Sequence, residues 1–561
     1  MSQPDTTLSA PPSLPRNALR VVALGGLGEV GRNMTVLEHR GKLLIIDCGV
    51  LFPEEHQPGV DVILPDFTFL RDRLDDVVGI LLTHGHEDHI GAVPYLLRER
   101  NDIPVFGSRL TLGLVAAKLK EHRIRPTTIE VAEGDRQKLG SFECEFVAVN
   151  HSIPDALAIA VRTSAGLLLH TGDFKMDQFP IDGRLTDLPA FARLGDEGVD
   201  LFLTDSTNAE VPGFTTSERD LAPAIEKVFR TARGRVVVSS FASHVHRIQQ
   251  VINAAHANKR KVAFVGRSMV RNMEIAQKLG YLDVPRGLIV DVKALSNLPD
   301  HKITLVCTGS QGEQMAALSR MAKGDHQISI GEGDVVLMAS SVIPGNEMSI
   351  TRVINGLTRL GADVVHKGNA KVHVSGHASS GELVYCYNIV RPRNVMPVHG
   401  EWRHLRANGD LAIATGMDAD RVVVVGDGVV VDLIDGQARV SGKVPADHIY
   451  VSGGVVGGVT EDSLRDRVTL SQEGTVTIVA LVDFETGRLT EPPEFLARGL
   501  GADASIFDDA IPAIEKALAT ASADRITDPI ELEKRIERVV TQWAGRKYRR
   551  NPLVIPVVVE A

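Results

Sequence analysis

Four side chains that can bind a metal ion lie within six consecutive positions near residue 85. They are His84, His86, Asp88 and His89. Imidazole and carboxylate ligands together suit zinc, and manganese becomes possible as the share of oxygen ligands rises. The motif follows the apolar run 77–82 and precedes the helix-like stretch 90–100. We therefore predict a turn at the mouth of a strand that directs ligands to two metal centres, rather than a histidine-rich surface turn.

Other polar side chains follow apolar runs that are typical of buried strands. They are Asp47, His151, Asp173, Asp205 and His399. Loops held by a rigid scaffold often carry binding and catalytic residues. Seven of the side chains named so far make up the ligand inventory of a two-metal site: His84, His86, Asp88, His89, His151, Asp173 and His399. Two ions roughly 3.5–4 Å apart can share a hydroxide and stabilise an in-line displacement at phosphorus. We expect the substrate to be an ester that resists hydrolysis.

The bulk composition excludes several classes of protein. The chain of 561 residues exceeds what one core usually supports, so we expect two to four domains. A net charge of −10 argues against coating nucleic acid through a global positive field, although bound ions supply local positive charge. The four cysteines form no C-x-x-C pair, which disfavours a disulfide framework and favours a cytoplasmic location. No apolar run is long enough for a membrane span.

The glycines of segment 25–31 satisfy the pattern G-x-G-x-x-G. A dinucleotide-binding loop would be followed by a helix. The segments 34–38 and 43–47 instead read as a hairpin, so we expect a tight loop close to the metal site.

From about residue 216 the chain alternates helices and short strands, which predicts a separate domain with a parallel sheet. The turns after its strands carry small and hydroxylic residues, and one of them contains Arg267 and Ser268. Backbone N–H groups in such turns can bind a phosphate. Taken singly, such turns are also ordinary connections between a strand and a helix. The last hundred residues predict a small α/β appendage.

These motifs resemble those of a known family. Asp47, the 84–89 motif, His151 and Asp173 resemble successive motifs of the metallo-β-lactamase superfamily. The insertion after Asp173, together with Asp205, His377 and His399, resembles the β-CASP group of nucleases. Segments 23–31, 83–91, 373–377 and 397–401 are similar to the bacterial ribonuclease J family.

The resemblance implies an α/β fold in which a metallo-β-lactamase αββα sandwich is interrupted by a β-CASP domain. The expected parts are a disordered tail (1–16), the first part of the metallo-β-lactamase domain (17–215), the β-CASP domain (216–385), the second part of the metallo-β-lactamase domain (386–458), and a linker with a small C-terminal α/β domain (459–561).

The resemblance also implies roles for individual residues. His84, His86 and His151 would hold one zinc ion, and Asp88, His89 and His399 the other, with Asp173 bridging. Asp47 would orient a ligand imidazole, as outer carboxylates commonly do. His377, partnered by Asp205, would donate a proton to the departing 3′ oxygen or fix the scissile phosphate. Substrate phosphate would bind at His373, Val374, Ser375, Gly376 and His377, and a 5′-monophosphate pocket would add Arg267 and Ser268.

The implied activity is 5′-to-3′ exonuclease and endonuclease cleavage of single-stranded RNA in messenger decay and ribosomal RNA maturation. A homodimer or homotetramer, and an RNA helicase or degradation-complex partner, are also implied. Three alternatives stay open: a DNA-processing nuclease of the same group, a small-ester hydrolase of the superfamily, and a scaffold with an inactive metal fold. A histidine at position 399 favours RNA over DNA as the substrate. Because every expected ligand position is filled, a scaffold with an inactive metal fold is disfavoured.

Overall fold

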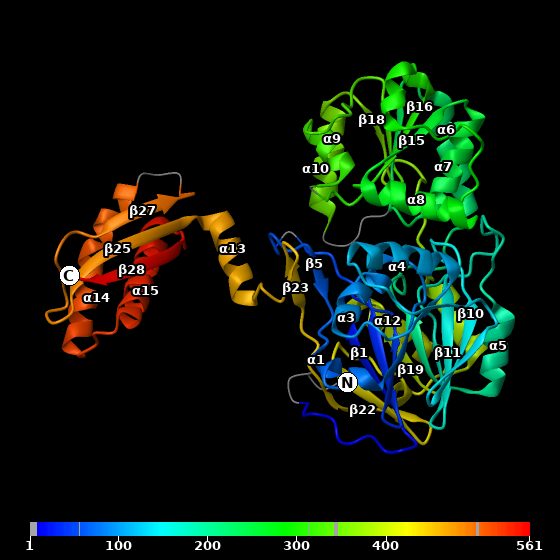
Figure 1. Cartoon of the computed structure of the whole chain (residues 1–561), viewed down its shortest axis with the longest axis horizontal. Coiled ribbons are helices and arrows are strands. Elements are labelled where there is room, and N and C mark those ends of the chain that lie inside the picture. The colour runs from blue at the N-terminus through cyan, green and yellow to red at the C-terminus, as the bar shows by residue number, and fades with distance from the viewer. Residues whose placement is uncertain (1–7, 55, 314, 341–345, 501–503) are drawn as a thin grey trace. The chain divides into compact units, whose positions relative to one another are not determined.

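The computed structural model describes residues 8–561 except 55, 314, 341–345 and 501–503. The described chain forms two compact units (Figure 1). The first contains the residues up to Phe52 together with Ile63–Ile449. The second contains Pro53–Val62 and Tyr450–Ala561.

Two sheets packed face to face form the centre of the first unit. The eight-stranded sheet has the order β22 (Gln437–Lys443), β21 (Val429–Ile434), β1 (Leu19–Gly25), β3 (Met34–His39), β4 (Lys42–Ile46), β6 (Val77–Leu81), β7 (Val105–Gly107) and β8 (Thr128–Glu130). The six-stranded sheet has the order β19 (Val395–Val398), β13 (Val199–Asp205), β12 (Gly166–His170), β11 (Leu157–Thr163), β10 (Phe142–Ala148) and β9 (Arg136–Leu139).

Most central strands are buried along their whole length, because helices cover the outer faces of both sheets. All seven residues of β1 and of β13 are buried, which explains their nearly continuous apolar sequences. Beyond the six-stranded sheet lie α5 (Leu188–Glu197), α11 (Ser380–Val390) and α12 (Trp402–Ala414), which share its outer core. The helices α2 (Glu87–Ile90), α3 (Val93–Glu99) and α4 (Arg109–Glu121) follow strands of the other sheet. The predicted αββα sandwich is confirmed.

A parallel five-stranded sheet forms the inserted domain, as predicted. Its order is β15 (Lys261–Val265), β16 (Ile303–Cys307), β14 (Val236–Ser239), β17 (Val335–Met338) and β18 (Asp363–Val365). The helices of this part are α6 (Ala222–Thr231), α7 (Val245–Ala257), α8 (Arg267–Leu279), α9 (Ala317–Lys323) and α10 (Glu347–Arg359) (Figure 1). The carboxyl ends of parallel strands meet at one edge of the sheet, so the hydroxylic segments that follow them lie together.

The C-terminal unit has its own core. Strand β25 (Thr475–Asp483) pairs with β26 (Arg488–Leu489), β27 (Glu494–Arg498) and β28 (Leu553–Glu560). Helices α14 (Ile511–Ala523) and α15 (Pro529–Tyr548) pack against the buried side of this sheet, and α13 (Glu461–Glu473) precedes it. The small α/β appendage is thus present as predicted.

The structure differs from the sequence analysis at two local points. Residues 8–16 fall in the predicted disordered tail, but Lys443 N–H donates to Ser9 O (2.9 Å) and Arg20 donates to Pro12 O (2.8 Å). The stretch 90–100 is not one helix: α2 ends at Ile90 and α3 begins at Val93. The predicted domain boundaries stay predictions. Among the described residues, no helix is both long and apolar enough to cross a bilayer.

Candidate active site

Every predicted metal ligand lies just beyond the end of a buried strand or in the loop that follows it. Strand β6 leads into His84, His86, Asp88 and His89, β10 into His151, β12 into Asp173, and β19 into His399. The fold thereby brings together side chains that are up to 315 positions apart, from His84 to His399. Their ligand atoms form two groups that share Asp173, and within each group these atoms lie within 4.8 Å of one another.

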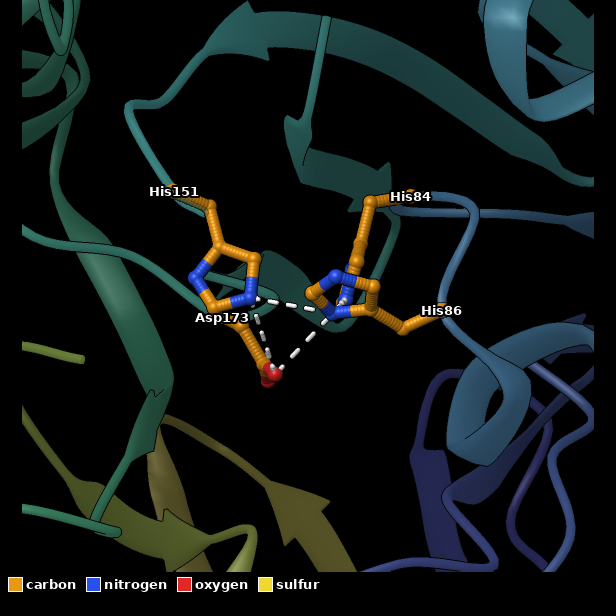
Figure 2. A group of neighbouring side chains, drawn as sticks. All are labelled: His84, His86, His151 and Asp173. Carbon is orange, nitrogen blue, oxygen red and sulfur yellow. Dashed lines mark hydrogen bonds and ion pairs between the residues drawn. The ribbon is translucent and has the colours of Figure 1, made fainter. Parts of the chain in front are cut away.

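The first group consists of three imidazoles and one carboxylate (Figure 2). His86 Nδ1 lies 3.0 Å from His84 Nε2 and 3.2 Å from His151 Nε2. Asp173 Oδ2 lies 3.7 Å from both of those Nε2 atoms. Three ring nitrogens that converge in this way can all serve as ligands of one ion.

The second group contains Asp88, His89, Asp173 and His399. Asp173 Oδ2 lies 3.2 Å from His89 Nε2, and Asp173 Oδ1 lies 2.5 Å from His399 Nδ1. Asp88 Oδ2 lies 3.6 Å from both His89 Nε2 and His399 Nε2. Because one oxygen of Asp173 faces both groups, this carboxylate has the position of a bridging ligand.

Hydrogen bonds outside the two groups fix the orientation of the ligand rings. His89 Nδ1 lies 2.7 Å from Asp47 Oδ2, so this nitrogen carries the proton and leaves Nε2 for an ion. Thr83 donates its backbone N–H and its hydroxyl to the two oxygens of Asp47, each at 2.8 Å, and its Oγ1 lies 3.0 Å from His84 Nδ1. His151 Nδ1 donates to Gly376 O at 2.7 Å. Such partners select the tautomer and raise the affinity of a metal site.

Two of these residues have left-handed backbone conformations that non-glycine residues rarely adopt. Asp47 has φ 61° and His399 has φ 53°. Such strain costs about 1–3 kcal/mol per residue and persists where the surrounding structure holds it in place. Both residues directly follow a strand, Asp47 after β4 and His399 after β19.

Burial sets the protonation state of the imidazoles in the first group. Burial lowers the pKa of His84 and His151 well below the usual value and lowers the pKa of His86 to about 4. These imidazoles are therefore neutral at pH 7, as ligands must be.

In the second group burial opposes the charged ring of His89, but Asp173, Asp88 and Asp47 raise its pKa well above the usual value, so an ion must displace a proton there. Burial acts against the charge of Asp173, but His399 and His89 hold its pKa well below the usual value.

His377 and Asp205 form a pair beside the second group. His377 Nδ1 lies 2.8 Å from Asp205 Oδ2 and 4.0 Å from Asp173 Oδ2. Burial opposes the charged ring, but Asp205, Asp173 and Asp88 raise the pKa of His377 to about 9. A protonated imidazole at neutral pH can donate a proton to a leaving group.

The donor set fits divalent metal ions. His399 Nε2 is buried and has no hydrogen-bond partner within the described part of the chain, although it faces the second group. A buried polar atom without a partner is costly unless it binds something. Imidazole nitrogens and carboxylate oxygens are common zinc ligands. His84, His86 and His151 would hold one ion and Asp88, His89 and His399 the other, with Asp173 between them.

The predicted phosphate-binding residues are only partly drawn into this site. The segment 373–377 reaches it, because Gly376 contacts His151 and His377 contacts Asp205. Ser375 Oγ accepts from His377 N–H at 3.2 Å. Arg267 is exposed and Ser268 is partly buried at the start of α8, and among the described residues no hydrogen bond or ion pair joins them to the metal groups.

Sequence reasoning missed three residues of the site. Thr83 orients His84, and Asn33 donates to Asp88 O. His170 is buried at the end of β12, and its Nδ1 accepts from Gly172 N–H (3.0 Å) in the turn that carries Asp173. His170 was visible as a histidine at a strand end, three positions before Asp173. Asn33 gave no such signal, because it follows a loop and not a strand.

Comparison with known proteins agrees with this geometry. Family models match along the chain: "Metallo-beta-lactamase superfamily" (27–122), "Ribonuclease J, beta-CASP domain" (233–357), "Zn-dependent metallo-hydrolase RNA specificity domain" (361–422) and "Ribonuclease J C-terminal domain" (462–561).

Relatives with assigned names cover almost the whole chain. Ribonuclease J of Mycolicibacterium smegmatis is 51% identical over 554 residues, which is 99% of each chain. Ribonuclease J of Corynebacterium glutamicum is also 51% identical, over 98% of this chain and 77% of its own. Ribonuclease J of Thermus thermophilus is 39% identical, over 97% and 96%. A crystal structure of a protein of unknown function from Enterococcus faecalis shares the fold, with a TM-score of 0.52, 14% identity, and coverage of 74% of this chain and 99% of its own.

The fold and the site define a metal-dependent hydrolase of the metallo-β-lactamase superfamily with a β-CASP domain. Its sequence identity to named relatives over nearly its full length narrows the assignment further. The chain belongs to the ribonuclease J family, and it is a metal-dependent ribonuclease.

Proposed function

We propose that this ribonuclease uses two zinc ions, one in each group of ligands, to cleave single-stranded RNA from the 5′ end and also internally. The observation that carries the proposal is the pair of ligand groups that share Asp173 and lie beside the His377–Asp205 pair. When bound, zinc would make hydroxide available at neutral pH and neutralise charge on the scissile phosphate. Manganese in place of zinc is compatible with the oxygen ligands.

The protein residues have distinct roles in this reaction. Asp47 and Thr83 hold His84 and His89 in the tautomers that metal binding needs. His377 donates a proton to the departing 3′ oxygen, and Asp205 keeps that ring protonated and oriented. General acid catalysis of this kind contributes typically 10²–10⁴-fold to the rate.

A 5′-monophosphate pocket would direct cleavage to the 5′ end. We assign it to the segment with His373, Val374, Ser375, Gly376 and His377, with Arg267 and Ser268 as further contributors. His244, which lies 6.4 Å from His373 between ring centroids, supports this location. It is 3% exposed, and neither ring nitrogen has a hydrogen-bond partner among the described residues. Buried polar atoms of this kind favour a polar ligand.

The wider biological role belongs to the same proposal. The enzyme would act in messenger decay and ribosomal RNA maturation, as a homodimer or homotetramer, and with a helicase or degradation-complex partner. Its four cysteines are buried and unpaired, which supports a reducing, cytoplasmic location.

Competition between substrates tests the proposal. Labelled single-stranded RNA with a 5′-monophosphate would be mixed with the same RNA bearing a 5′-hydroxyl, and separately with DNA of the same sequence. We expect 5′-monophosphate RNA to be degraded first in both mixtures. Preferred degradation of DNA would favour the DNA-processing alternative, and hydrolysis of small esters without RNA cleavage would favour the small-ester hydrolase. If Arg267→Ala preserves the wild-type preference for 5′-monophosphate, Arg267 is not part of the pocket.

A further inference from the structure

The glycine-rich loop 25–31 and the two residues after it contact Asp88, His89 and the backbone directly after His399. Strand β2 (Leu27–Gly28) pairs with β20 (Gly400–Glu401), directly after His399. Gly400 N–H donates to Gly26 O at 3.2 Å. The loop therefore fixes the backbone on the carboxyl side of His399.

Asn33, at the end of the same segment, fixes the backbone of Asp88. Its backbone N–H (2.9 Å) and its side-chain Nδ2 (3.1 Å) both donate to Asp88 O. The same Nδ2 lies 3.1 Å from His89 Nε2, the nitrogen that the second ion would take. Asn33, His89, Asp173 and His399 also line one small cavity. The backbone carbonyl of Asp88 thus depends on one asparagine, whose amide also lies beside the ligand nitrogen of His89.

The loop has little freedom to move. A Cβ atom on Gly26 would lie 2.3 Å from Asn33 Oδ1, so any side chain at position 26 would displace the amide of Asn33. Arg32, which is 2% exposed, donates to Asp427 Oδ2 (3.0 Å), Glu29 Oε1 (2.6 Å) and Asp447 O (2.8 Å). Asp427 Oδ1 accepts from Leu27 N–H at 3.0 Å. Asp427 therefore joins the two ends of the loop.

The first group has no comparable dependence on this loop. Thr83 holds His84 and the carbonyl of Gly376 holds His151, and among the described residues no hydrogen bond joins the loop or Asn33 to a ligand of this group. Thr83 and Asp47 support His84 of the first group and His89 of the second. Gly376 supports only the first group, through His151, and the loop with Asn33 supports Asp88 and the backbone beside His399.

We propose that Asn33 and the Arg32–Asp427 pair are positioning residues that hold Asp88 and the backbone beside His399 in place for the second metal ion only. This inference rests on the proposed function, because it assumes two ions per subunit. Asn33 acts directly on the backbone of Asp88, and the Arg32–Asp427 pair acts through the shape of the loop. Mutation of such supporting residues typically lowers metal affinity 10–100-fold.

Metal titration tests the inference on the full-length protein. Metal-free wild type, Asn33→Ala and Asp427→Ala would be titrated with cobalt(II), with visible absorption and equilibrium dialysis as readouts. The matched control is Asp432→Ala. This substitution removes the carboxylate that pairs with the buried Arg20 at 2.8 Å. Both residues lie in the eight-stranded sheet, and no hydrogen bond or ion pair joins either of them to a metal ligand in the described part of the chain. Asn33→Ala is the milder of the two variants and should fold even if Asp427→Ala does not.

We expect wild type and the control to bind two ions, and both variants to bind the first ion normally and the second about 10–100-fold more weakly. RNA cleavage by Asn33→Ala should recover in excess metal, with little change in KM. If wild type binds two ions and both variants bind them with unchanged affinity, the positioning role is wrong but the two-ion proposal stands. Equal weakening of both steps, or the same loss in the control, would also overturn the positioning role. A single binding step in wild type would overturn the two-ion proposal as well.

Discussion

Replacement of Gly376 by alanine should disrupt the first metal group, because Gly376 in the segment 373–377 contacts the ligand His151. A Cβ atom at position 376 would lie 2.6 Å from His151 Cε1, 2.8 Å from His151 Nδ1 and 3.1 Å from Ser152 Cβ. Carbon atoms prefer a separation of about 3.5 Å or more, so the ring must move by roughly 0.9 Å. Metal–ligand distances tolerate only about 0.2 Å, so His151 Nε2 would leave its ligand position.

The expected consequence is a large loss of both metal and activity. A misplacement of about 1 Å costs on the order of 10² in rate, and we expect kcat for RNA to fall by about that factor. Binding of the first ion should weaken about 10–100-fold. The assays are steady-state RNA cleavage and zinc content after dialysis at a fixed free zinc concentration.

The matched control is Gly331→Ala, because an added Cβ there meets no described atom within 4 Å. This variant should retain both kcat and zinc. If Gly376→Ala keeps its zinc and its kcat within about twofold of wild type, the inferred support of His151 by this segment is wrong. If it keeps zinc but loses activity, Gly376 acts on the substrate and not on the metal site.

Three further outcomes follow from the same geometry. Asp205→Asn should lower kcat about 10²–10⁴-fold with a smaller change in KM. In wild type the pKa of His377 is raised to about 9, so activity should be lost only as the pH rises through that value. In the variant the pH–rate profile should show this loss at a lower pH. Removal of metal by a chelator should abolish cleavage and lower Tm, and zinc should restore both in calorimetry, because an ion that binds only the folded state stabilises it. Glu218→Gln should cost about 3–5 kcal/mol in denaturant unfolding, because it breaks the buried pair with Arg247 (2.6 Å). In wild type, burial acts against the charge of Glu218 but Arg247 holds its pKa far below the usual 4.5, so the stability from this pair is present above about pH 4.5 and is lost as pH falls toward the lower folded-state pKa.

The metal ligands were predictable because each stands next to a local signal. His84, His151, Asp173 and His399 all follow apolar runs of strand type, and parallel or neighbouring strands bring their ends together. The hairpin after the glycine-rich loop was also predictable, and β3 and β4 do pair antiparallel across a short turn. The parallel sheet of the inserted domain followed from the alternation of helices and strands.

The supporting residues were not predictable in the same way. Asn33 contacts Asp88, which lies 55 positions away, and Leu27 contacts Asp427, which lies 400 positions away. A hydrogen bond over such a separation depends on tertiary packing and leaves no periodic pattern in the sequence. The break between α2 and α3 was missed for a related reason: Gly91 N–H still bonds to Glu87 O, and the chain then turns at Ala92 because Cys48 O accepts the N–H of Ala92.

In the mechanism that we propose, the two metal groups and His377 together cleave RNA from its 5′ end. The most direct measurement is a time course on single-stranded RNA that carries a labelled 5′-monophosphate, with zinc-loaded wild type, His84→Ala and His377→Ala. Wild type should release labelled mononucleotide from the earliest time points, His84→Ala should release none, and His377→Ala should be slower by about 10²-fold or more. Release of label at the wild-type rate by His84→Ala, or intact RNA after incubation with zinc- or manganese-loaded wild type, would contradict the account.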